Sequence, residues 1–85
     1  VCGGSGSFLL KNAIGAGAQA FVTADYKYHE FFDAEQKILV ADTGHFENEQ
    51  FTIDLLARYI EQGIKNIATF AVRLSEVETN PVKYF

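Results

Sequence analysis

The feature of this sequence that most restricts its fold is an alternation of short apolar runs with segments of helical spacing. Apolar and β-branched runs occupy Ala20 to Ala24, Lys37 to Ala41 and Ile67 to Leu74, and the first two lead into helical periodicity. Parallel strands need a crossover between them, usually a helix. The alternation therefore predicts an α/β fold with a mainly parallel or mixed sheet and helices packed on it.

The predicted helices are bounded by residues that commonly start or stop helices. Residues 8–14 have helical spacing and precede two glycines that can end a helix, Gly15 and Gly17. A second helix would begin after Asp25 as its N-cap, and a long amphipathic helix covers residues 45–62. The run Ile38 to Val40 is typical of a strand buried on both faces.

Length limits the chain to one small domain, because 85 residues hold only one core. We therefore expect a single domain over residues 1–85. Val1-Cys2 runs straight into a glycine loop, as the last part of a strand would, and the chain has no methionine. From these two features we infer that an N-terminal portion precedes this segment.

Composition and charge exclude several classes of protein. With 48% hydrophobic and 21% charged residues the chain should fold. A net charge of −4 without a Lys/Arg cluster argues against nucleic-acid binding by this segment. Cys2 is the single cysteine, which excludes an internal disulfide and favours a reducing, cytoplasmic location. No apolar run approaches the ~20 residues that cross a bilayer.

Residues able to do chemistry gather in loops that follow the predicted strands. In an open parallel sheet, ligands bind beyond the carboxyl ends of the strands. Three loops meet this condition, namely residues 3–7, 24–27 and 42–49. One edge of the sheet is thus the expected location of a site.

His45 and Glu49 form the sharpest candidate pair. At about 100° per residue, Glu49 lies about 40° from His45 on the stripe that Leu56 continues, whereas Glu47 lies on the polar side. An inward carboxylate is costly unless it is paired or binds a cation, so a divalent metal would satisfy both side chains. Alternatively, Glu49 only complements the helix dipole and His45 lies near a cap. Two ligands cannot complete a coordination shell, so others must come from elsewhere.

Three further features allow both a functional and a structural interpretation. His29 could be a general acid/base or a ligand, but the pattern is equally typical of a surface histidine. The loop Gly3 to Ser7 could cradle a phosphate, although it lacks the Walker and dinucleotide endings and suits a tight turn better. Cys2 is expected in the core rather than as a nucleophile.

Four segments together resemble the C-terminal part of the NIF-three-like family, also called GTP cyclohydrolase I type 2 homologues or dinuclear metal centre proteins. They are Cys2 to Gly6, Val22 to Glu30, Asp42 to Glu49, and Asn80-Pro81, in the family's order and spacing. The resemblance implies an α/β fold with a two-metal site in a cleft between two halves. The family usually has glycine where this chain has Ala24. The methyl group of Ala24 works against a close approach of that loop's backbone to its neighbours.

The resemblance also implies roles for particular residues. His45 and Glu49 match metal ligands of the family, whose other ligands, a histidine pair and an aspartate, belong to the N-terminal half. His29 matches a histidine that should border the cleft, where we expect it to act in catalysis. The resemblance further implies a homo-oligomer in the form of a hexameric ring. The resemblance thus implies a metal-dependent hydrolase using two divalent ions, with zinc, manganese or iron possible, or alternatively a ring-forming structural or interaction protein in which metal only stabilises the assembly.

Overall fold

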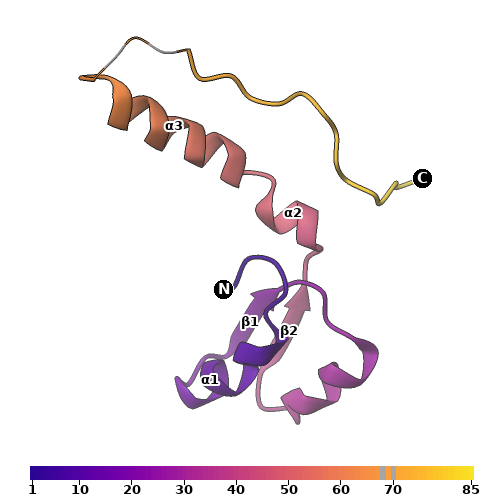
Figure 1. The fold of residues 1–85 in the computed structure, drawn as a ribbon. Helices are drawn as coiled ribbons and strands as arrows, with labels where there is room; N and C mark the ends of the chain where they lie inside the picture. The colour runs from indigo at the N-terminus through magenta and orange to yellow at the C-terminus, as the bar shows by residue number, and fades with distance from the viewer. Residues whose placement is uncertain (68, 70) are drawn as a thin grey trace. The chain divides into compact units, whose positions relative to one another are not determined.

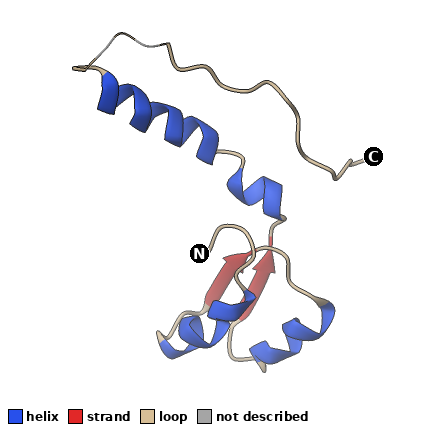
Figure 2. Cartoon of the chain, viewed as in Figure 1, coloured by secondary structure: helices blue, strands red, loops and turns tan. Residues whose placement is uncertain are grey.

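The computed structural model describes residues 1–67, 69 and 71–85, which form two compact units, Val1–Glu49 and Gln50–Phe85. Figure 2 shows the helices, strands and loops of both units. Within each unit, the bounds of the elements follow from local sequence and packing. The single domain expected over residues 1–85 stays a prediction.

A pair of parallel strands forms the centre of the first unit. Strand β1 (Ala20–Thr23) pairs with β2 (Leu39–Asp42) in a register that places Ala20 opposite Leu39 and Thr23 opposite Asp42. Figure 1 shows both arrows pointing the same way. Both strands lie where the apolar runs predicted them, within two residues at each end. The α/β class and the parallel pairing are therefore confirmed.

The N-terminal segment runs along the other edge of β1. The Cys2 amide donates to the Val22 carbonyl at 2.9 Å, and the Ala24 amide donates to the Gly4 carbonyl at 3.0 Å. Ser5 and Ala24 form an isolated parallel bridge. The segment thus behaves as the end of a neighbouring strand, in agreement with the expectation for Val1-Cys2.

The first predicted helix is present and ends at a glycine. A 3₁₀ turn, η1 (Ser7–Leu9), continues into α1 (Leu10–Gly15). The Ala18 amide donates to Ala13 and the Gly17 amide donates to Ile14, while Gly17 has a φ of 74°. These two bonds and the left-handed residue form a Schellman motif, which satisfies carbonyls at the helix end. Gly17 is therefore the residue that stops this helix.

The second predicted helix is a 3₁₀ helix, η2 (Tyr28–Ala34), and Asp25 is not its cap. Lys27 occupies the N-cap position, and its amide donates to the Glu30 carboxylate at 2.9 Å. Asp25 instead has a φ of 57° and directs its side chain to His45. The capping prediction was wrong because the exposed Lys27 amide bonds to the side chain of Glu30, three residues later, and not to Asp25.

The core of the first unit is small and lies around β1. The buried apolar side chains come from α1, β1, η2 and the connecting loops: Leu10, Phe21, Tyr26, Ala34 and Ile38. Cys2 packs against this cluster, as predicted. Leu39 is 67% exposed, so β2 is not buried on both faces. Within residues 1–49, only one face of this strand carries packed apolar side chains, which corrects the expectation of a doubly covered strand.

The long helix predicted for residues 45–62 is interrupted. Helix α2 (His45–Glu49) belongs to the first unit, and α3 (Thr52–Ile64) belongs to the second. Phe51, between them, has φ −80° and ψ −9°. This ψ departs from the α-helical value of about −42°, which opens the ladder of hydrogen bonds. The helix ends one residue beyond the predicted stop at Gly63.

The last predicted strand is not formed among the described residues. Residues 71–74 have no strand assignment, and Ala68 and Phe70 lie outside the described residues. A strand exists only through a ladder with a neighbour, and no such ladder is described for residues 71–74. Within the described part of the chain, no helix is both long enough and apolar enough to cross a bilayer.

Candidate metal-ligand site

The three loops expected to form a site meet at the carboxyl ends of β1 and β2. The Gly4 carbonyl accepts from the buried Thr23 hydroxyl at 3.0 Å, which ties the glycine loop to the end of β1. Asp42, at the end of β2, accepts from the Tyr26 amide at 3.0 Å through Oδ2 and from the Gly44 amide at 3.1 Å through Oδ1. One carboxylate thus fixes both the loop after β1 and the turn into α2.

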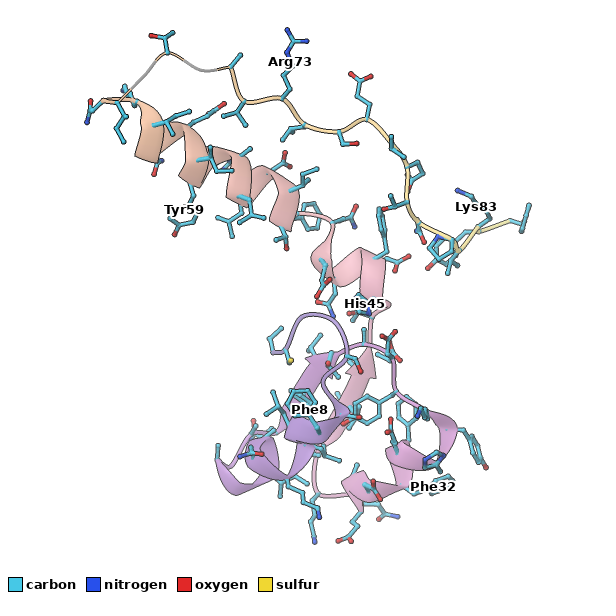
Figure 3. The ribbon with its side chains drawn as sticks, viewed as in Figure 1. Phe8, Phe32, His45, Tyr59, Arg73 and Lys83 are labelled. Carbon is cyan, nitrogen blue, oxygen red and sulfur yellow. The ribbon has the colours of Figure 1, made fainter. Side chains whose placement is uncertain are left out.

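His45 and Glu49 face each other on α2. The Nε2 atom of His45 lies 3.1 Å from Oε2 of Glu49, one helical turn away. Figure 3 shows His45 beside the ends of the two strands. The i, i+4 spacing read from the sequence therefore does bring the two side chains together.

The predicted burial of this pair was wrong. The His45 and Glu49 side chains are 50% and 48% exposed. Glu47, expected on the solvated side, is the less exposed of the two acids. The predicted burial requires one continuous helix lying on the core, whereas α2 has only five residues, none of them buried.

The other nitrogen of His45 is held by Asp25. Its Nδ1 atom lies 2.6 Å from Oδ2 of Asp25, which follows β1. Asp25 has the left-handed backbone conformation. This conformation costs about 1–2 kcal/mol for residues other than glycine, although Asp tolerates it better than most. The imidazole thus lies between two carboxylates, one from the loop after β1 and one from α2.

The glycine loop closes on the same two side chains. A Cβ atom at Gly4 would lie 2.6 Å from Oε1 of Glu49 and 3.1 Å from Nε2 of His45, and the residue has a φ of 63°. Glycine is the residue that accepts both the positive φ and this close approach. The loop is also a poor phosphate-binding site, because the carboxylate beside it would repel the negative charge of a phosphate.

The electrostatic environment of His45 follows from these contacts. The hydrogen bond with Asp25, and then the charge of its carboxylate, raise the pKa of His45 above its usual value, and Glu49 adds to the rise. Without a metal, the site therefore favours the imidazolium. A metal ion would have to displace that proton, because a histidine must be neutral at the nitrogen that binds a metal.

The remaining predicted site residue has no described hydrogen bond or ion pair with this cluster. His29 is exposed in the first turn of η2, and no hydrogen bond between it and His45 or Glu49 is present in the described part of the chain. Asp25 is the residue whose role sequence reasoning missed. Its position directly after β1, in one of the three loops at the strand ends, was the available signal.

His45 and Glu49 fit two ligands of one metal ion. Bonds of about 2.1 Å to both atoms would hold them roughly 3.0 to 3.4 Å apart, close to the observed 3.1 Å. Among residues 1–67, 69 and 71–85, no group of three or more His, Cys, Asp or Glu side chains is arranged to hold a metal. The described chain thus offers a pair of ligands and not a complete shell.

These features define a segment of an α/β protein with a histidine and a glutamate paired at the carboxyl edge of a parallel sheet. A model of the family Duf34/NIF3 (NGG1p interacting factor 3) matches residues 1–81. The chain therefore belongs to the Duf34/NIF3 family, in agreement with the resemblance found in its sequence.

Curated relatives carry the name GTP cyclohydrolase 1 type 2 homolog. A protein of Campylobacter jejuni is 33% identical across the whole chain, which covers 32% of that relative. A Staphylococcus epidermidis protein is 34% identical over 99% of this chain, which covers 23% of that relative. A Nostoc protein is 28% identical over 100% of this chain, which covers 31% of that relative. The chain thus spans about a third or less of these relatives.

Proposed function

We propose that His45 and Glu49 donate to a divalent metal site of a metal-dependent hydrolase, which residues beyond this chain complete. The observation that supports this proposal is the 3.1 Å approach of Nε2 to Oε2 at the carboxyl ends of two parallel strands. Histidine and carboxylate together suit zinc, manganese or iron. Membership of a family whose relatives are named as cyclohydrolase homologues supports a hydrolytic reaction.

The chain's own residues would bind and orient in this function. Asp25 and Glu49 hold the imidazole from two sides, and Gly4 admits both ligands close to its backbone. When bound, two ions would lower the pKa of a shared water and clamp the attacked group. His29 stays a prediction as a proton-transfer residue, since no described contact joins it to the pair.

Elemental analysis of the full-length protein tests the ligand assignment. The double variant His45→Ala, Glu49→Ala should lose stoichiometric metal. Glu47→Ala, on the same helix, is the matched control and should keep it. Unchanged metal content in the double variant would refute the assignment.

A second candidate is a structural or interaction protein that forms a ring, which we propose as a hexamer. The exposed apolar side chains of α3, among them Leu55, Leu56 and Tyr59, favour a surface that another protein covers. If His45→Ala leaves every hydrolytic activity intact but breaks the oligomer or lowers its thermal midpoint, this reading is the better one. For either function we propose a cytoplasmic protein, because a single cysteine suits a reducing compartment.

A further inference from the structure

We propose that Asp25 is a positioning residue that makes Nε2, and not Nδ1, the metal-binding nitrogen of His45. This inference rests on the proposed metal function. A carboxylate only accepts hydrogen bonds, so the 2.6 Å contact with Asp25 Oδ2 requires a hydrogen on Nδ1. Glu49 also accepts from Nε2 when the ring is charged, but over the longer distance of 3.1 Å, so the shorter bond to Asp25 keeps the hydrogen on Nδ1 when the ring is neutral and leaves the lone pair on Nε2. This is the nitrogen that lies 3.1 Å from Glu49.

The backbone around Asp25 is fixed on both sides, which aims the carboxylate. Ala24 is fully buried, and its amide donates to the Gly4 carbonyl at 3.0 Å. The Tyr26 amide donates to Asp42 Oδ2 at 3.0 Å. Between these anchors Asp25 takes a left-handed conformation with a φ of 57°. Strain held in place by its neighbours is typical of residues whose direction matters for function.

The surroundings of Nε2 also favour this nitrogen over Nδ1 as the metal ligand. Gly4 lies against this nitrogen, where a Cβ would come within 3.1 Å, and Glu49 supplies the second oxygen ligand beside it. Nδ1 is covered by Asp25 and cannot also meet Glu49. A carboxylate that fixes the tautomer of a histidine ligand raises metal affinity without touching the metal.

The test uses Asp25→Gly in the full-length protein. Glycine accepts the positive φ, so this variant removes the carboxylate without straining the backbone. Asp25→Asn is the second variant, since asparagine tolerates this conformation and can still accept a weaker hydrogen bond. Asp33→Asn, an exposed acid of η2, is the matched control.

Two measurements are made on each variant. Nitrogen NMR of the metal-free protein at alkaline pH shows which ring nitrogen of His45 carries the hydrogen, with its signals assigned by their loss in His45→Ala. Zinc titration gives affinity and stoichiometry. We expect Asp25→Gly to shift the ring from Nδ1–H to Nε2–H and to weaken zinc binding about 10- to 100-fold at unchanged stoichiometry. Asp25→Asn should lose less, and Asp33→Asn should match the wild type.

Two results would overturn the inference. An unchanged ring-nitrogen pattern in Asp25→Gly does so whether or not zinc binds. Complete loss of stoichiometric zinc, as large as in Glu49→Ala, would make Asp25 a ligand instead of a positioning residue. Zinc binding that survives both His45→Ala and Glu49→Ala contradicts the proposed function instead, so the two failures are distinguishable.

Discussion

At the scale of single residues, two glycines of the glycine loop leave space for the side chains of neighbouring residues. Gly6 lies so close to β1 that a Cβ would come within 2.3 Å of the Thr23 hydroxyl, whereas Gly4 faces Glu49 and His45. The two glycines therefore have different functions. Gly6 lets the loop pack on the strand, and Gly4 makes room for the candidate ligands.

Replacing Gly4 with alanine should disturb stability and metal binding together. The added Cβ would displace Glu49 Oε1, and the φ of 63° would cost about 1–2 kcal/mol. Denaturant unfolding and zinc titration of the full-length protein measure the two effects. Gly3→Ala is the control, because its Cβ would meet Glu49 only at an ordinary 3.7 Å. Equal behaviour of the two variants would show that Gly4 does not support Glu49.

At the scale of elements, helix ends in the first unit depend on local chemistry that can be tested separately from the site. Helix α1 is stopped by Gly17, and η2 begins with the hydrogen bond from Lys27 to Glu30. Neither feature contacts His45 or Glu49 in the described structure. Changes there should alter folding and leave ligand geometry intact.

Gly17→Ala and Gly15→Ala should have opposite effects on stability. A Cβ would meet no atom within 4 Å at either position, so only backbone conformation differs. At a φ of 74°, alanine at position 17 should lower the free energy of unfolding by about 1–2 kcal/mol. Alanine at position 15, inside α1, should raise it by up to about 1 kcal/mol. Denaturant melts check both, and a shared sign would contradict the Schellman assignment.

Glu30 should make the stability of η2 depend on acid pH. The hydrogen bond from the Lys27 amide is the main cause that lowers the pKa of Glu30 below its usual value. Because the pKa of Glu30 is lower in the folded protein, the stability that this hydrogen bond contributes is present above the unfolded pKa of about 4.5. That stability is lost as pH falls through the folded pKa. Glu30→Gln keeps an acceptor but does not titrate, so its unfolding free energy should fall less steeply in acid. Parallel pH profiles for the two proteins would refute this.

At the scale of the whole molecule, α3 carries an apolar stripe that the described chain leaves exposed. Ile53, Leu56 and Ile60 are 44%, 55% and 51% exposed, although their spacing is typical of a helix face that packs on a core. The chain covers only 32% of its Campylobacter relative. We therefore expect other parts of the full-length protein or its assembly to cover this stripe.

Truncation of Leu56 should accordingly destabilise the full-length protein. If the stripe is buried there, Leu56→Ala should lower the free energy of unfolding by about 2–5 kcal/mol. Glu61→Ala, on the polar side of α3, should stay within about 0.5 kcal/mol. Thermal or denaturant unfolding compares the two variants. A similarly small change in both would mean that the stripe remains exposed.

The parts that sequence predicted well are those that depend on near neighbours. The two strands, the stop at Gly17 and the approach of His45 to Glu49 arise from apolar runs, glycine conformation and i, i+4 spacing. The errors have two causes. The exposure of Leu39 and the turn of Asp25 toward His45 depend on which distant segment lies opposite, whereas the exposure of Glu49 follows from the break of the predicted helix at Phe51.

By itself the sequence determined the family, the parallel α/β arrangement and the candidate ligand pair, because periodicity and motif order are written along the chain. Only the tertiary structure decided that Asp25 turns to His45 rather than capping a helix. That contact joins residues 20 positions apart, and it exists because β1 and β2 end side by side. Local propensity carries no information about such a meeting, since the parallel register of the two strands creates it.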